Sequence, residues 1–281
     1  MKRYKSILKN GEQMLMNAGI HNAVGEAWYL FEDAFSMDRM TYYMEQEREC
    51  MNPEEMEKYQ TYLRRRVEER IPLQYLLGTQ QFMGLDFQVS PAVLIPRQDT
   101  ETLIEEIIHQ AAGVRTVLDM CTGSGCIAIS LAHFMDLDQC VGADISKEAL
   151  NIAKENGKSL APMVEFINSD LFDEIEGRYD LIVSNPPYIA SKECRELMPE
   201  VREHEPMLAL DGHEDGLHFY RRIIREAPEY LNDSGYLFFE IGYDQGKSVP
   251  ALMKEAGFID IVVKKDLAGL DRIVYGRYES R

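Results

Sequence analysis

The sequence predicts an α/β protein in which a mostly parallel sheet with an antiparallel C-terminal edge follows an N-terminal helical bundle. Three observations support this fold class. Residues 1–80 carry apolar side chains only at helical spacing. From about residue 99 helices and strands alternate, as a parallel sheet with right-handed crossovers requires. The last two apolar runs, 258–263 and 272–276, are closely connected and therefore favour an antiparallel pair at one edge.

The N-terminal segment contains several helix signals. Ile7, Met14 and Leu15 share one helical face ahead of Gly19, where the pattern stops. Pro53 opens a later helix, because a residue in the first turn needs no backbone N–H. These signals predict a small bundle with no strand.

A short linker separates the bundle from the sheet. Apolar and polar residues alternate from Phe82 to Leu94 around Gly84 and Pro91, which predicts a hairpin. The sequence is therefore expected to form a helical domain (1–80), a hairpin linker (81–98) and an α/β domain (99–281).

The net charge of the chain indicates which class of partner it binds. The chain has 48 acidic and 30 basic residues, a net charge of −18. Its densest basic run, Arg64-Arg65-Arg66, is followed at once by Glu68 and Glu69, so we interpret it as a solvated helix face. This balance disfavours direct nucleic-acid binding and suits a basic protein partner, because complementary fields raise association rates.

Other classes are disfavoured by composition. No run approaches the ~20 apolar residues of a membrane span, and the N-terminus leads into an amphipathic helix rather than a signal sequence, so a cytoplasmic location is expected. The five cysteines form no Cys-x-x-Cys pair, which favours reduced thiols and argues against a metal site.

The apolar run 179–184 ends in an unusual tetrapeptide, Asn185-Pro186-Pro187-Tyr188. The prolines stop any strand or helix, because they donate no N–H and fix their own φ. The resulting rim presents the Asn185 amide and free carbonyls, which can grip a planar NH2 group while the Tyr188 ring packs against it. The pattern indicates transfer to an amide or amino nitrogen, with an ordinary turn as the alternative.

Residues 114–132 predict a strand, a glycine turn and a helix. Gly123 and Gly125 let the backbone approach a ligand, and the helix N-terminus offers free N–H groups, so a nucleotide-like cofactor fits. Gly123-x-Gly125-x-x-Ala128 with Asp144 also satisfies the dinucleotide fingerprint, which keeps NAD as an alternative.

Acidic residues at strand ends help to distinguish NAD from a nucleotide-like cofactor without a pyrophosphate. Asp119 precedes the glycine turn, where its charge would oppose a pyrophosphate but could accept a hydrogen bond from the ammonium of a methionine moiety. Asp144 ends the predicted strand 139–144 and is placed to take two ribose hydroxyls. Asp170 and Leu171 follow the next strand and could meet the amine and the ring face of adenine, although turn chemistry also explains an acidic residue there.

This succession resembles S-adenosylmethionine-dependent methyltransferases that act on exocyclic or amide nitrogen, and the rest of the chain resembles the HemK/PrmC family. The added motifs are Gln74–Gly78, Phe82–Leu85, Ile95–Glu101, Glu205-Pro206, Ala209–Gly212 and Asp266–Arg272. Two positions depart from the family pattern: Cys121 stands where many members carry glycine, and His213 interrupts what is often a Gly-Gly pair.

The resemblance implies a Rossmann-like class I methyltransferase sheet and methylation of the glutamine amide in the Gly-Gly-Gln motif of peptide chain release factors. The N-terminal helical domain would help to dock that protein. The implied substrate-binding residues are Asn185, Pro186, Pro187 and Tyr188, of which Asn185, Pro186 and Tyr188 are the catalytic candidates. The implied S-adenosylmethionine-binding residues are Asp119, Cys121, Thr122, Gly123, Ser124, Gly125, Asp144, Asp170, Leu171 and Asn185.

The expected mechanism needs orientation rather than a strong base. Asn185 Oδ1 and the Pro186 carbonyl would each accept one amide N–H, so that the nitrogen lone pair faces the methyl group. His204 and His218 are interpreted as structural, and Arg97 as half of a salt bridge. Alternatives are a ribosomal-protein glutamine methyltransferase, a nucleic-acid amino-group methyltransferase and a non-catalytic or NAD-dependent protein.

Overall fold

The computed structural model describes residues 2–279 and divides the chain into two compact units. The first comprises the chain up to Gly78 together with the segment Pro199–His204. The second runs from Thr79 to Met198 and resumes at Glu205. The short helix Pro199–His204 therefore belongs to the N-terminal unit, although the chain on either side of it belongs to the second unit. Among residues 2–279, no helix has the length and apolar character that spanning a bilayer requires.

The N-terminal unit is helical, as the spacing predicts. Its core includes Trp28, Phe31 and Tyr59, and Phe31 makes edge-on ring contacts with Tyr59. Pro53 does open a helix, whose N-cap Asn52 accepts a hydrogen bond from the Glu54 N–H. The helices are α1 (Tyr4–Asn17), α2 (Ala23–Phe35), α3 (Arg39–Glu45), α4 (Pro53–Glu68), α5 (Leu73–Leu77) and α9 (Pro199–His204).

The interpretation of the arginine run on α4 as wholly solvated is wrong for Arg66. This side chain is buried and pairs with Glu26 at 2.6 Å and with Glu200 at 3.1 Å. Arg70 also contacts Glu200 at 2.6 Å. Sequence spacing could not reveal this network, because Glu200 lies 134 residues from Arg66.

The linker forms the expected hairpin, shifted by a few residues. Strands β1 (Thr79–Phe82) and β2 (Leu85–Gln88) pair antiparallel around Met83 and Gly84, both of which have positive φ. Phe82 and Phe87 are buried in the core of the second unit.

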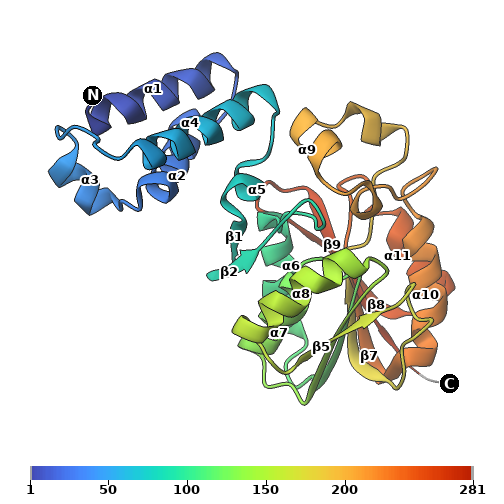
Figure 1. Cartoon of the computed structure of the whole chain (residues 1–281). Helices are drawn as coiled ribbons and strands as arrows, with labels where there is room; N and C mark the ends of the chain where they lie inside the picture. The colour runs from blue at the N-terminus through green and yellow to red at the C-terminus, as the bar shows by residue number, and fades with distance from the viewer. Residues whose placement is uncertain (1, 280–281) are drawn as a thin grey trace. The chain divides into compact units, whose positions relative to one another are not determined.

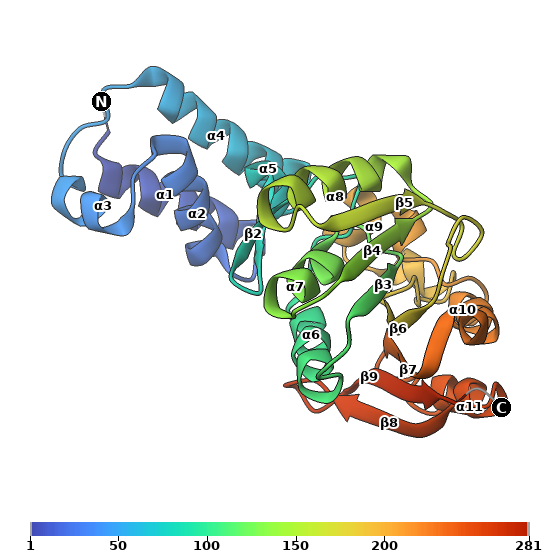
Figure 2. The same ribbon diagram turned by 90° about the horizontal axis from the view of Figure 1, so that it is seen from below.

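The second unit is built on one seven-stranded sheet with the order β5-β4-β3-β6-β7-β9-β8 (Figure 2). The first five strands in this order are parallel, whereas β9 is antiparallel to both neighbours, which confirms the antiparallel edge. The insertion of β9 between β7 and β8 was not evident from the sequence. The strands are β3 (Thr116–Met120), β4 (Gln139–Asp144), β5 (Val164–Asn168), β6 (Tyr179–Ser184), β7 (Leu231–Glu240), β8 (Ile259–Lys265) and β9 (Asp271–Tyr278).

Helices cover both faces of the sheet (Figures 1 and 2). One face carries α6 (Gln98–Gln110), α7 (Cys126–Phe134) and α8 (Lys147–Leu160), and the other carries α10 (His218–Tyr230) and α11 (Ser248–Glu255). Two 3₁₀ turns, Glu193–Glu196 and Met207–Ala209, lie between β6 and α10. Strand order reverses at β3, so a crevice is expected at the carboxyl ends of β3, β4 and β6.

Candidate functional site

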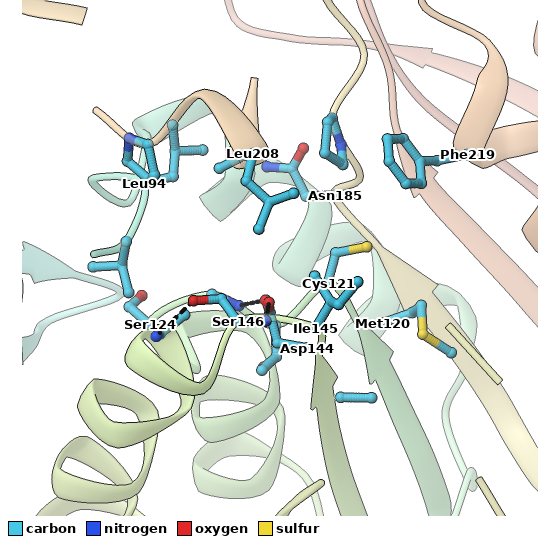
Figure 3. Close-up of a pocket in the computed structure, with 18 of the residues that line it drawn as sticks. Leu94, Met120, Cys121, Ser124, Asp144, Ile145, Ser146, Asn185, Leu208 and Phe219 are labelled. Carbon is cyan, nitrogen blue, oxygen red and sulfur yellow. Dashed lines mark hydrogen bonds between the residues drawn. The ribbon is translucent and has the colours of Figure 1, made fainter. Parts of the chain in front are cut away.

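A cavity of about 310 Å³ lies at these carboxyl ends (Figure 3). Its wall is formed by the glycine turn after β3, the ends of β4 and β5, Asn185 after β6, residues from 92–100 and residues from 206–222. Its volume falls in the range of small-molecule sites, about 300–1,000 Å³. The cavity lies wholly within the second unit.

The glycine turn forms the floor of the cavity. Cys121, Gly123 and Gly125 all have positive φ, and Cys121, Thr122, Gly123 and Ser124 line the cavity. Gly125 instead begins α7, where an added Cβ would lie 3.1 Å from the Phe166 ring. Glycine at position 125 therefore permits close packing of the turn on the sheet.

The Asp144 carboxylate in the cavity wall is fixed by two backbone hydrogen bonds. Its Oδ2 accepts the Gly123 N–H and its Oδ1 accepts the Ser146 N–H, each at 2.9 Å (Figure 3). These bonds fix the carboxylate plane but leave further lone pairs on both oxygens. Burial raises the pKa of Asp144. The group is therefore held ready to accept hydrogen bonds from a ligand.

Asp119 lies beneath the turn rather than in the cavity wall. Its Oδ2 accepts the Thr122 hydroxyl at 2.6 Å and the Ala128 N–H at 3.1 Å. Its Oδ1 is buried without a hydrogen-bond partner. Burial raises the pKa of Asp119 to about 7. The residue stabilises the turn and the start of α7, and its bond to a cofactor ammonium stays a prediction.

Another part of the cavity wall combines polar, apolar and aromatic side chains. Leu171 lines it, as does Asp170, whose Oδ1 accepts a hydrogen bond from Arg222 at 2.9 Å. Phe219 also lines the cavity, together with His213 and His218, whose rings are tilted against each other with centroids 4.3 Å apart. Sequence reasoning treated His218 as structural and gave no role to Phe219 or Arg222, because α10 carries no recognisable motif.

The Asn185-Pro186-Pro187-Tyr188 loop contributes two residues to the cavity wall, Asn185 and Pro187. The Asn185 Nδ2 lies 3.5 Å from the Thr100 hydroxyl. Pro186 does not line the cavity, and the Tyr188 ring packs against the hydrophobic core beside α10. Burial raises the pKa of Tyr188. The contact of the Tyr188 ring with a substrate therefore stays a prediction.

This loop is held from behind by residues that sequence reasoning missed. Gln245 Nε2 donates to the carbonyls of Tyr188 at 3.1 Å and Gly216 at 3.2 Å. At Gly216 an added Cβ would lie 2.3 Å from the Tyr188 oxygen, and at Gly212 it would lie 2.9 Å from the Pro187 oxygen. Gly212 and Gly216 are visible in the sequence, but nothing in the sequence indicates that they pack against residues 187–188.

Arg97 forms the predicted salt bridge. Its partner is Glu205, which also accepts the Ile95 N–H at 3.2 Å. Arg97 also lines the cavity. The ion pair thus joins the residues before α6 to the segment between β6 and α10.

The sequence of this chain is similar to those of known methyltransferases. Residues 6–78 match the family model described as the PrmC N-terminal domain, and residues 97–203 match the methyltransferase small domain. A release factor glutamine methyltransferase from Geobacter sulfurreducens is 44% identical over 94% of this chain and 92% of its own length. The chain belongs to the release factor glutamine methyltransferase family. The family member from Clostridium botulinum is 38% identical over 97% of this chain and 98% of its own length.

Solved structures confirm the fold class. A methyltransferase from Pyrococcus furiosus is 16% identical, with a TM-score of 0.55 over 71% of this chain and 91% of its own. A Thermus thermophilus 16S rRNA N2 G1207 methyltransferase, solved with AdoMet and guanosine, is 16% identical, with a TM-score of 0.51 over 72% and 50%. The antiparallel β9 also departs from the usual parallel dinucleotide-binding order. Because the matched family model and the relatives are methyltransferases, the NAD alternative is not retained.

Proposed function

We propose that this chain transfers a methyl group from S-adenosylmethionine to the side-chain amide nitrogen of the glutamine in the Gly-Gly-Gln motif of peptide chain release factors. The observation that carries the proposal is the position of Asn185, a side chain able to accept an amide N–H, in the wall of a cavity large enough for a nucleoside cofactor. Family membership supplies the substrate class, because the relatives are named for release factor glutamine methylation.

The cavity residues fit this cofactor. Asp144 offers oriented carboxylate oxygens for ribose hydroxyls. Ile145 and Leu171 offer apolar surface for a purine, and Asp170 lies beside Leu171 for its amine. The turn of Cys121, Thr122, Gly123 and Ser124 brings the backbone close, and Asn185 lies across the cavity from Asp144 (Figure 3). When bound, the cofactor supplies an electrophilic methyl group on a sulfonium sulfur.

The protein must orient a weak nucleophile, because the amide lone pair is delocalised into its carbonyl. In our proposal Asn185 Oδ1 and the Pro186 carbonyl each accept one N–H of the substrate NH2 group. Both protons are then held in one plane, and the lone pair points into the cavity. Orientation of this kind can lower a barrier by about 7–11 kcal/mol. Positive charge that develops on nitrogen is stabilised by the same two oxygens.

The proposed substrate and the net charge of the chain together suggest the protein partner. A release factor acts in the cytoplasm, where we place this enzyme, and the net charge of −18 favours a basic protein partner over direct binding of nucleic acid. The N-terminal helical unit is the proposed docking domain. A ribosomal-protein glutamine presents the same amide, so it remains the alternative substrate.

Mass spectrometry tests the assignment directly. Release factor is incubated with the enzyme and methyl-labelled S-adenosylmethionine, and peptides are mapped for one added methyl group. We expect the label only on the Gly-Gly-Gln glutamine. A release factor with asparagine at this position is the matched control, because its amide is one methylene shorter.

Two other outcomes would contradict the proposal. Label on another residue of the release factor would reject the assigned nitrogen. Label on ribosomal protein or nucleic acid, with none on release factor, would reject the assigned substrate.

A further inference from the structure

Three polar side chains form a row that begins in the cavity wall, at Asn185 and Thr100, and ends behind it at Glu240. Asn185 Nδ2 donates to Thr100 Oγ1 at 3.5 Å, and the Thr100 hydroxyl donates to Glu240 Oε2 at 2.6 Å. They come from the end of β6, the first turn of α6 and the end of β7. Thr100 is 2% exposed and Glu240 is 1% exposed. A buried row of this kind requires a defined direction for each hydrogen bond.

The direction follows from proton counting. A threonine hydroxyl has one proton, and a carboxylate can only accept. The Thr100 hydroxyl donates its one proton to Glu240. The Thr100 oxygen can therefore only accept a hydrogen bond from Asn185. The Asn185 amide must then turn its NH2 toward Thr100. Its Oδ1 is left free for a substrate N–H, which is the orientation that methyl transfer requires.

The surroundings hold Glu240 in place. The Tyr220 hydroxyl donates to the Glu240 backbone carbonyl at 2.8 Å. The charged groups that act on the carboxylate are Arg272 and Arg97, which favour ionisation, and Asp99, which opposes it. Burial is the largest influence and raises the pKa of Glu240 to about 7. Protonation of Glu240 would allow the Thr100 hydroxyl to reverse and donate to Asn185 Oδ1.

We propose that Thr100 and Glu240 are positioning residues that set the amide orientation of Asn185 through a directed pair of hydrogen bonds. The inference rests on the proposed function and adds that the Glu240 carboxylate acts on the substrate through three successive hydrogen bonds, two of which lie within the protein. The 3.5 Å contact is long, as such contacts often are before substrate binds.

Thr100→Val and Thr100→Ser form the matched test. Valine keeps the shape but removes the hydroxyl, so kcat on release factor should fall about 10²-fold, the scale of a misplaced reacting group. Serine restores the hydroxyl and should retain most of the activity. Cofactor affinity, measured by calorimetry, should change far less than kcat in both variants, because the proposed role of Thr100 is to orient Asn185.

A double variant separates positioning from general packing. In an Asn185→Ala background no amide remains to orient, so Thr100→Val should cause no further loss of kcat. Equal turnover by Thr100→Val and the unchanged protein would overturn the proposal, as would full additivity in the double variant. Absence of methyl transfer by the unchanged protein would instead reject the proposed function.

Glu240→Gln gives an independent reading if Thr100→Val fails to fold. At saturating cofactor, kcat of the unchanged protein should rise between about pH 6 and pH 8. Over this range Glu240 ionises, so that Thr100 donates to Glu240 and Asn185 donates to Thr100. Glutamine cannot ionise, so this variant should have lower and pH-independent turnover. If kcat of Glu240→Gln still rises with pH, ionisation of Glu240 does not set the direction of these hydrogen bonds.

Discussion

Two loops of the cavity wall are held in different ways. The glycine turn has contacts within a few residues, because Thr122 donates to Asp119 and the Gly125 N–H donates to the Thr122 carbonyl at 2.9 Å. Its more distant partners, Asp144 and Asn156, lie 21 and 32 residues from the positions that they contact. The Asn185–Tyr188 loop is held by residues from distant parts of the chain. Thr100 lies 85 residues before Asn185, and Gln245 lies 57 residues after Tyr188. The geometry of the cofactor turn is thus encoded over shorter stretches of the chain than the geometry of the substrate loop.

This difference predicts that binding and turnover can be damaged separately. The largest effect is expected from Asn185→Ala. Removal of one preorganised partner costs about 10²–10³ in rate. The fold and most cofactor affinity should be retained, because Asn185 is not needed for the glycine turn. Turnover near that of the unchanged protein on release factor would show that the loop is merely the end of a strand.

Asp144→Ala should have the converse effect. Loss of a charge-assisted hydrogen bond acceptor is expected to weaken S-adenosylmethionine binding by about 1.5–3 kcal/mol. Turnover at saturating cofactor should change far less. Calorimetry with S-adenosylmethionine, and with NADH as the control ligand, measures the effect. Unchanged affinity would remove Asp144 from the cofactor site.

Gly216→Ala tests the support behind the substrate loop. Its φ is +72°, and the new Cβ would lie 2.3 Å from the Tyr188 oxygen, so the loop must move. Gly113→Ala is the matched control, because Gly113 has a φ of +94° and nothing within 4 Å of the added atom. Both variants should lose about 1–3 kcal/mol of stability to backbone strain. Only Gly216→Ala should also have a lower kcat. Equal kcat values in the two variants would contradict the proposal that Gly216 supports the substrate loop.

The smallest expected effect concerns stability. Burial raises the pKa of Asp119 to about 7, far above its unfolded value. The folded chain therefore keeps a proton that the unfolded chain has lost, so this residue makes the folded state less stable as pH rises from about 4 to about 7. Asp119→Asn keeps an acceptor for Thr122 and Ala128 but cannot ionise. Urea unfolding at about pH 6 and pH 8 should show a smaller decrease in stability for the variant, and an equal decrease would contradict the assignment.

The sequence predicted those parts of the fold and site that are specified over short distances. The bounds of β4 and β6 match the predicted runs 139–144 and 179–184, since each contains a short series of small or apolar residues that ends at a polar one. The position of β9 between β7 and β8 could not be predicted, because strand order depends on long-range pairing. Gln245 and Glu240 were missed for the same reason. Their contacts with residues 185–188 and Thr100 exist only once the sheet has formed.

The buried charge of Arg66 bears on how the protein can be divided experimentally. A fragment that ends at Gly78 retains Glu26 but loses Glu200, which the complete chain supplies from α9. Removal of a partner from a buried ion pair costs about 3–5 kcal/mol, which is comparable with the whole stability of a small domain. The N-terminal unit is therefore complete only when a six-residue helix encoded between β6 and β7 is present. A deletion in that distant segment should unfold part of the N-terminal unit, although no residue before 79 has changed.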